Sequence, residues 1–245
     1  MQKNYLKNLS KIHDEGFSEH SVKSFPFILK TINRFHKKGL IVELGCGSGI
    51  TADKLIKNNY SVIGVDYSAS MIELAKKNVP KVKFIVGSFH EIEIPKCVAV
   101  LAIGEVFNYN FDEKTNYKSL KKVFQRIYNS LEKDGMFMID FLEENQIKGN
   151  KTIKTFVEGK HWVVLTEKKE NKSKKELERR IITFYKNKNG YKRNEEVHKI
   201  KLFRTVKIIR ILQNIGFDTK FYRSYGNYKL RKNQTVIVSK KITTV

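Results

Sequence analysis

Residues 43–49, Glu-Leu-Gly-Cys-Gly-Ser-Gly, place one carboxylate before three alternating glycines. Glycine at 45, 47 and 49 lacks the Cβ atom that would hold a ligand away from the backbone, and it allows the positive φ angles of a tight turn. An apolar run enters this turn, and helix-like sequence follows from Thr51. The pattern predicts a buried strand, a turn beneath a bound nucleotide-type ligand, and then a helix.

The glycine spacing separates the kinds of nucleotide site. A dinucleotide fingerprint reads G-x-G-x-x-G and a P-loop reads G-x-x-x-x-G-K-[ST], whereas Glu43 to Gly49 reads E-x-G-x-G-x-G. The carboxylate of Glu43 would repel a pyrophosphate and attract a ligand that carries positive charge. A nicotinamide dehydrogenase is therefore disfavoured, and a cationic ligand is favoured.

Asp66 is a second candidate binding residue. It ends the run Ser-Val-Ile-Gly-Val-Asp, which predicts the second parallel strand, and ligands of open α/β sheets bind at the carboxyl ends of strands. Asp66 lies 19 residues beyond Gly47, close to the spacing of about 20 at which an acid binds ribose hydroxyls. Its carboxylate can accept both hydroxyls of a vicinal diol. A helix N-cap is the alternative role, which Ser68 could fill instead.

Val42 to Gly49 resembles, residue for residue, the first motif of the class I S-adenosylmethionine-dependent methyltransferases. That cofactor carries an α-ammonium and a sulfonium, so the resemblance implies that Glu43 faces a cationic ligand and Asp66 the ribose. The cofactor-binding residues that it implies are Glu43, Gly45, Cys46, Gly47, Gly49, Asp66, Tyr67 and Met71.

The chain departs from the family at Ser88, where members commonly have an aspartate that accepts a hydrogen bond from the adenine amino group. A serine hydroxyl can also accept that bond, and Phe89 can supply an apolar wall. Ser88 and Phe89 therefore remain cofactor candidates.

The apolar run 97–103 predicts a central parallel strand buried on both faces. In the doubly wound order the tip of this strand faces the methyl group of the cofactor. Gly104 at the tip is therefore a further cofactor candidate, and Glu105 and Tyr109 are candidate catalytic residues.

His198 is the third candidate catalytic residue. Alternation places it on one strand face with Ile200 and Leu202, where a core role and a catalytic role both stay open. A base is required where the acceptor is a hydroxyl, thiol or ammonium that must lose a proton.

The acceptor is expected to be a small molecule. Enzymes that methylate exocyclic base nitrogens resemble one another in an Asn- or Asp-Pro-Pro-aromatic signature after this strand, and no proline follows Pro95 here. The net charge of +23 keeps an RNA methyltransferase as an alternative, although nine of the 48 basic residues are arginine and solvated lysines account for the rest. A non-catalytic cofactor-binding protein is the other alternative.

Composition sets further limits. Two cysteines provide neither a disulfide framework nor a metal site. No run of 18 apolar residues occurs and the first residues lack a signal-peptide pattern, so we expect a cytoplasmic protein without a membrane partner. The oligomeric state is left open.

Repeated strand and helix patterns predict a single α/β methyltransferase domain over 1–245, with a doubly wound, mostly parallel seven-stranded sheet whose last strand is antiparallel. Residues 1–37 are expected to form an N-terminal helical lid, with its second helix after Pro26. Residues 152–204 predict an antiparallel β insertion, which in similar small-molecule methyltransferases forms a roof over the acceptor pocket. Its lysine-rich run 168–175 is expected to be a solvated hairpin tip.

Overall fold

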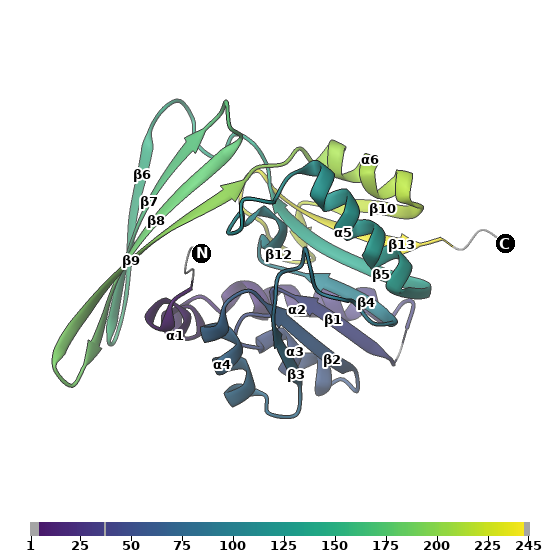
Figure 1. The fold of residues 1–245 in the computed structure, drawn as a ribbon, viewed down its shortest axis with the longest axis horizontal. Coiled ribbons are helices and arrows are strands. Elements are labelled where there is room, and N and C mark those ends of the chain that lie inside the picture. The colour runs from purple at the N-terminus through teal and green to yellow at the C-terminus, as the bar shows by residue number, and fades with distance from the viewer. Residues whose placement is uncertain (1–4, 37, 243–245) are drawn as a thin grey trace.

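The computed structural model describes residues 5–36 and 38–242. The start of the chain and the outermost parts of the expected lid, residues 1–4 and 37, lie outside the described residues. A seven-stranded sheet in the order β10-β13-β5-β4-β1-β2-β3 forms the centre of the molecule (Figure 1). Its strands are β1 (Leu40–Leu44), β2 (Ser61–Asp66), β3 (Lys83–Val86), β4 (Cys97–Ala102), β5 (Leu131–Leu142), β10 (Phe217–Tyr222) and β13 (Gln234–Lys241).

The strand directions confirm the predicted doubly wound sheet. β1, β2, β3, β4 and β5 pair in parallel, and β13 runs antiparallel to both β5 and β10. All six residues of β4 are buried, as its continuous apolar run predicted. Parallel pairing brings the carboxyl ends of β1, β2 and β4 to one edge, where the predicted ligand-binding residues lie.

Helices cover both faces of this sheet. Val100 and Ala102 of β4 pack with α5 and α6 on one face, and Ala99 and Leu101 pack with α2, α3 and α4 on the other. None of the helices in the described residues combines the length and apolar composition needed to cross a bilayer. The helices are α1 (Lys7–Gly16), α2 (Glu19–Ile32), α3 (Ile50–Ile56), α4 (Ala69–Asn78), α5 (Tyr117–Ser130), α6 (Thr205–Ile215) and the single 3₁₀ turn η1 (Val106–Asn108).

Pro26 does not separate the two N-terminal helices as expected. α2 runs through it from Glu19 to Ile32, and the break falls after Gly16. A proline inside a helix costs about 3 kcal/mol. Phe25, Ile28 and Ile32 are buried on either side of it, and each buried side chain of this size returns about 1.5–3 kcal/mol.

A second, four-stranded antiparallel sheet in the order β6-β7-β8-β9, called the insert sheet below, projects beyond α1 (Figure 1). Its strands are β6 (Thr152–Gly159), β7 (Trp162–Asn171), β8 (Glu176–Asn187) and β9 (Gly190–Lys201). Leu9 and Ile12 of α1 pack against Trp162, Val164 and Ile181 of this sheet. A short hairpin of β11 (Ser224–Tyr225) and β12 (Tyr228–Lys229) lies near α2.

The expected hairpin tip at 168–175 is wrong for its first residues. β7 continues to Asn171, and β8 begins at Glu176, so the turn consists of residues 172–175 alone. Burial of Leu177 and its pairing with Glu170 extend the ladder beyond the lysines. Since side chains alternate along a strand, Lys168 shares its face with Val164 and Thr166, and all three line an internal cavity.

Candidate functional site

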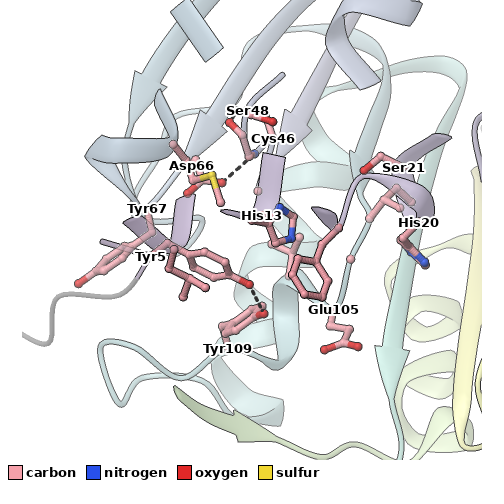
Figure 2. A pocket seen from close by; sticks show the side chains of 18 of the residues that line it. Tyr5, His13, His20, Ser21, Cys46, Ser48, Asp66, Tyr67, Glu105 and Tyr109 are labelled. Atoms are coloured by element: carbon pink, nitrogen blue, oxygen red, sulfur yellow. Dashed lines mark hydrogen bonds between the residues drawn. The ribbon is translucent and has the colours of Figure 1, made fainter. Parts of the chain in front are cut away.

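A cavity of about 640 Å³ lies at the carboxyl ends of β1, β2 and β4, between these ends, α1 and the insert sheet. Cavities of about 300–1,000 Å³ suit small molecules and cofactors. Figure 2 shows side chains from the glycine turn, from α1 and α2 and from the segment after β4 around this space. One cavity therefore joins the predicted cofactor residues to the predicted acceptor residues.

The glycine turn leaves its backbone open to this cavity. Gly45 and Cys46 donate backbone hydrogen bonds to the Val65 carbonyl at 2.7 and 3.0 Å, which anchors the turn to β2. Gly47 has a φ of 54°, and Gly104 after β4 has a φ of 96°. A Cβ added at either glycine would meet nothing within 4 Å, although both residues line the cavity. These two positions allow a ligand to approach the backbone closely.

Asp66 is held beside the glycine turn. Its carboxylate accepts hydrogen bonds from the Gly47 amide at 2.9 Å and from the Ser68 amide at 2.8 Å. Burial raises its pKa, and these backbone donors partly oppose that rise. The Ser68 hydroxyl accepts from the Met71 amide at 3.2 Å and so caps α4 itself. Asp66 is therefore not required as the cap and lines the cavity.

Glu43 is a buried carboxyl that lacks a complete set of partners. Its side chain lines the cavity while the residue is 4% exposed, and its Oε2 has no hydrogen-bond partner among the described residues. Burial raises its pKa to about 8, so the carboxyl is mostly protonated at neutral pH in the empty site. A cation bound beside Glu43 would favour its charged form. The unpartnered Oε2 of Glu43 is therefore suited to accept a hydrogen bond from a cationic ligand.

Most other cofactor candidates from the sequence also line the cavity. Gly49 is the exception: it is the N-cap of α3, and a Cβ there would lie 3.1 Å from Phe84, so Gly49 belongs to the packing behind the turn. The candidates that line the cavity are Glu43, Gly45, Cys46, Gly47, Asp66, Tyr67, Met71, Ser88, Phe89 and Gly104.

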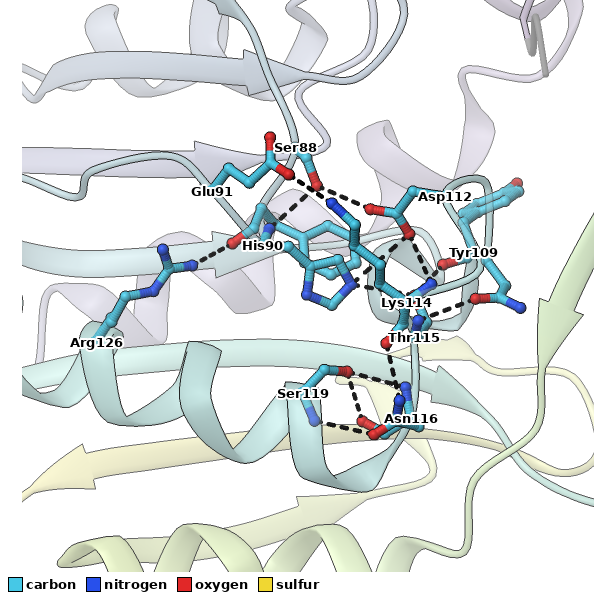
Figure 3. A network of polar contacts seen from close by, with 12 residues as sticks. Ser88, His90, Glu91, Tyr109, Asp112, Lys114, Thr115, Asn116, Ser119 and Arg126 are labelled. Atoms are coloured by element: carbon cyan, nitrogen blue, oxygen red, sulfur yellow. Dashed lines mark hydrogen bonds and ion pairs between the residues drawn. The ribbon is translucent and has the colours of Figure 1, made fainter. Parts of the chain in front are cut away.

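Asp112 lies next to Ser88 and was missed in the sequence (Figure 3). The Ser88 hydroxyl donates to Asp112 Oδ2 at 3.4 Å, and both residues line the cavity. The loop is held in place because Thr115 donates its amide to the Asn110 side chain at 3.0 Å. An ion pair of 2.6 Å between Lys114 and Glu91 ties it to the loop after β3. No motif marks Asp112, since it meets Ser88 only through the packing of two loops.

A buried carboxylate organises the segment after β4. Asp140 of β5 is fully buried, and it accepts from the Gly104 amide at 3.0 Å and the Glu105 amide at 2.6 Å. It also accepts from Tyr225 at 2.8 Å and pairs with His20 Nε2 at 2.9 Å. These bonds hold Glu105 at a φ of 64°, a conformation that costs a non-glycine residue about 1–2 kcal/mol. In the sequence, Asp140 could have been recognised because it is a single acid within the otherwise apolar second half of β5.

His20 of α2 also lines the cavity and was missed. Burial alone would lower its pKa, but the hydrogen bond and charge of Asp140 raise it by more, so the pKa lies above the usual 6.5. His13 lines the same cavity, and burial lowers its pKa to about 4. His20 is thus an imidazole of this cavity with a raised pKa and a buried carboxylate partner.

The three catalytic candidates from the sequence lie together, with different access to the cavity. Glu105 Oε2 pairs with Arg179 at 3.2 Å, and the Tyr109 hydroxyl meets the Tyr5 hydroxyl at 2.7 Å (Figure 2). His198 is fully buried, with its ring centroid 5.0 Å from that of Tyr5 and 5.9 Å from that of Tyr109. Glu105, Tyr109 and Tyr5 line the cavity, and His198 lies behind the two tyrosine rings.

Glu196 joins this cluster to the start of the described chain. Its carboxylate accepts from the Tyr5 amide at 2.6 Å and the Leu6 amide at 2.9 Å, and it pairs with His198 at 3.0 Å. Burial lowers the pKa of His198, and Glu196 partly opposes that change. The pair thus fastens the segment before α1 onto the insert sheet.

Residues 41–135 match the family model described as a methyltransferase domain. Trans-aconitate 2-methyltransferase of Rhodopseudomonas palustris (strain HaA2) is 34% identical over 84 residues, which cover 34% of this chain and 33% of that enzyme. The alignments with this and two other curated relatives cover less than half of each relative's length.

Solved structures extend the likeness to nearly the whole chain. An S-adenosylmethionine-dependent methyltransferase from Clostridium acetobutylicum has a TM-score of 0.80 at 19% identity, covering 98% of this chain and 100% of that chain. The sugar N-methyltransferase KedS8 from Streptoalloteichus has a TM-score of 0.76 at 12% identity, covering 99% and 94%. At these identities the likeness shows the fold. Residues 41–135 thus match a methyltransferase domain, within a chain that has the fold of an S-adenosylmethionine-dependent methyltransferase.

Proposed function

We propose that this protein transfers a methyl group from S-adenosylmethionine to a small-molecule acceptor by in-line displacement. The observation that carries the proposal is a single cavity with the two acids and open glycines at one end and polar side chains at the other. The methyltransferases of trans-aconitate and of a sugar amine, to which the chain is similar, act on small acceptors.

Two acids hold the donor in this proposal. Glu43 faces the cationic amino-acid end of the cofactor, and Asp66 accepts hydrogen bonds from the ribose hydroxyls. Tyr67, Met71 and Phe89 enclose the adenine, and the backbone of Gly47 and Gly104 lies against the cofactor. The bound sulfonium supplies an activated methyl carbon. The protein's main contribution is alignment, which can lower the barrier by about 7–11 kcal/mol.

We further propose that Asp112 supplies the carboxylate that the family commonly has at the position of Ser88. Their 3.4 Å contact places a carboxylate beside that position, at the edge of the cavity. The Tyr67 and Phe111 rings, with centroids 5.7 Å apart, lie next to the same loop. Asp112 would accept a hydrogen bond from the adenine amino group.

Replacing Asp112 by alanine is expected to raise the dissociation constant for S-adenosylhomocysteine by roughly 10- to 100-fold, because a hydrogen bond to a charged group contributes about 1.5–3 kcal/mol. Calorimetric titration measures the change. The wild type should discriminate against the inosine analogue, which lacks the amino group, and the variant should not. Glu73→Gln, an exposed change on α4, is the control and should bind normally. Equal discrimination by wild type and Asp112→Ala would exclude this role.

Proton removal from the acceptor requires a base, and the geometry adds His20 to the sequence candidates. Glu105 and Tyr109 line the cavity but are engaged by Arg179 and Tyr5, and a catalytic role for each stays a prediction. His198 also stays a predicted base, although its position suits support of the Tyr5 and Tyr109 rings. We propose His20, held by Asp140, as the leading base.

The function is tested by incubating the purified protein with S-adenosylmethionine and a panel of metabolites, and by measuring S-adenosylhomocysteine. Turnover with a small acceptor is the expected result. Tight cofactor binding without turnover of any acceptor would favour the non-catalytic alternative. Methyl incorporation into RNA, with binding that falls steeply as salt rises, would favour the RNA alternative suggested by the net charge of +23.

A further inference from the structure

Three cationic side chains face the acceptor end of the cavity. Lys168 of β7 and Arg179 of β8 are directly opposed in the strand register and lie on the same sheet face, and both line the cavity. Arg231, which follows the β11–β12 hairpin, lines it too. Like charges opposed across a strand pair destabilise a sheet. An anion bound between them would remove that repulsion.

The hydrogen-bonding capacity of these cations is only partly used. Arg179 donates from Nη2 to Glu105 at 3.2 Å and from Nη1 to the Tyr109 hydroxyl at 3.5 Å. Its Nε is buried without a partner, and within the described residues the side chains of Lys168 and Arg231 make no hydrogen bond or ion pair. The Nε of Arg179 and the Nζ of Lys168 are therefore available to a ligand.

The charges at this end do not cancel. Glu105 is the carboxylate that acts on Lys168 from within the cavity. The other nearby acids are already paired, Asp140 with His20 and Glu19 with Lys23. Three cations thus face one carboxylate, Glu105, which is itself paired with Arg179. Lys168 shows the excess of positive charge, because burial and then the charges of Arg179 and Arg231 lower its pKa to about 8.

These cations belong to the acceptor end, away from the first acid of the glycine turn. The groups that shift the pKa of Glu43 besides burial are Thr51 and Asp66, and none of the three cations is among them. Glu105, which follows Gly104 at the tip of β4, is the acid next to Arg179. The cationic side chains therefore surround the space where an acceptor would meet the methyl group.

We infer that the acceptor carries a carboxylate or phosphate group, which binds between Lys168 and Arg179 with Arg231 at its side. This inference rests on the proposed function and specifies its acceptor. The anion would accept hydrogen bonds from Lys168 Nζ and Arg179 Nε, while Glu105 and Tyr109 hold the guanidinium in place. A bound anion would also keep Lys168 protonated.

The test measures thermal shifts of the protein saturated with S-adenosylhomocysteine. The probes are trans-aconitate and citrate as carboxylates, glucose 6-phosphate as a phosphate, glucose as a neutral match and choline as a cation. We expect at least one anion to raise the melting temperature, and glucose and choline to leave it unchanged. The anion class that binds distinguishes carboxylate from phosphate.

Lys168→Met should raise the dissociation constant of that anion about tenfold or more, because one charge-assisted hydrogen bond is lost. The dissociation constant of S-adenosylhomocysteine should stay within about twofold of the wild-type value. The ligand-free variant should melt no lower than the wild type, because a repulsion is removed. Lys169→Met, one residue along β7 on the opposite, exposed face, is the matched control. Lys168→Gln should repeat the effect of Lys168→Met.

Proton uptake gives an independent readout. At about pH 8, anion binding should take up protons in the wild type, because Lys168 is then half protonated, and uptake should vanish in Lys168→Met. The charged groups that face Lys168 are Arg179 from β8, Arg231 after β12 and Glu105 after β4. The arginines stay protonated at this pH.

Three results would overturn the inference. In the first, no anion binds although S-adenosylhomocysteine does. In the second, anions bind equally to wild type and Lys168→Met. In the third, Lys168→Met loses S-adenosylhomocysteine, which assigns the cations to the cofactor's own carboxylate. Failure of S-adenosylhomocysteine to bind the wild type would instead refute the proposed function.

Discussion

Asp66→Ala is expected to raise the dissociation constant for S-adenosylmethionine by roughly 10²–10⁴-fold. Two hydrogen bonds from the ribose diol to one carboxylate would be lost, each contributing about 1.5–3 kcal/mol. Asp66→Asn keeps one acceptor oxygen, so its affinity for S-adenosylmethionine should fall less than that of Asp66→Ala. Calorimetric titration measures both variants.

Asp66 also accepts from the Gly47 and Ser68 amides, so a fall in stability has to be separated from a loss of contact. Thermal melting of the ligand-free variants makes that separation. Asp53→Asn, an exposed change on α3 next to the glycine turn, is the control and should bind like the wild type. Normal affinity in a folded Asp66→Ala protein would contradict the ribose assignment.

His20→Asn is expected to lower turnover by roughly 10²–10⁴-fold, the range that a positioned general base contributes. Cofactor affinity should stay within about twofold, because His20 is proposed to act on the acceptor. The measurement is S-adenosylhomocysteine formation with the best acceptor from the panel. His161→Ala, in the exposed turn between β6 and β7, is the control and should leave turnover unchanged.

The pH dependence separates a base from a structural contact. A base must be neutral to accept a proton, so the wild-type rate should rise with pH through the pKa of His20. Asp140 raises that pKa through its hydrogen bond and charge, against the effect of burial. Asp140→Asn should therefore shift the rise to lower pH, besides lowering the rate. Unchanged turnover in His20→Asn would remove His20 from the mechanism and return Glu105 to first place.

Local patterns in the sequence were enough to predict the central sheet and to select cofactor candidates of which most line one cavity. The apolar run 97–103, the alternating glycines and the acid at 66 each depend on neighbours within a few residues. Such patterns report which residues form an element and which end of it faces a ligand.

Several residues that line the cavity, or that hold its lining residues in place, escaped prediction because they meet only through tertiary packing. His20 and Asp140 are 120 residues apart and belong to α2 and β5. Asp112 reaches Ser88 across two loops. Lys168 was predicted to be in a turn, but it belongs to β7, which continues to Asn171 and so places Lys168 on the cavity face. A helix expected to begin after Pro26 was also misplaced, because core burial outweighs the cost of the proline.

The central claim is that Glu43 and Asp66 bind opposite ends of a cationic adenosyl sulfonium. The most direct test is calorimetric titration with S-adenosylmethionine at about pH 7 in buffers of different ionisation enthalpy. Since burial raises the pKa of Glu43 to about 8, binding of a cation should release close to one proton, and affinity should increase with pH until about pH 8. Glu43→Gln should bind without this release. An absence of heat with S-adenosylmethionine, together with binding of NADH, would contradict the account.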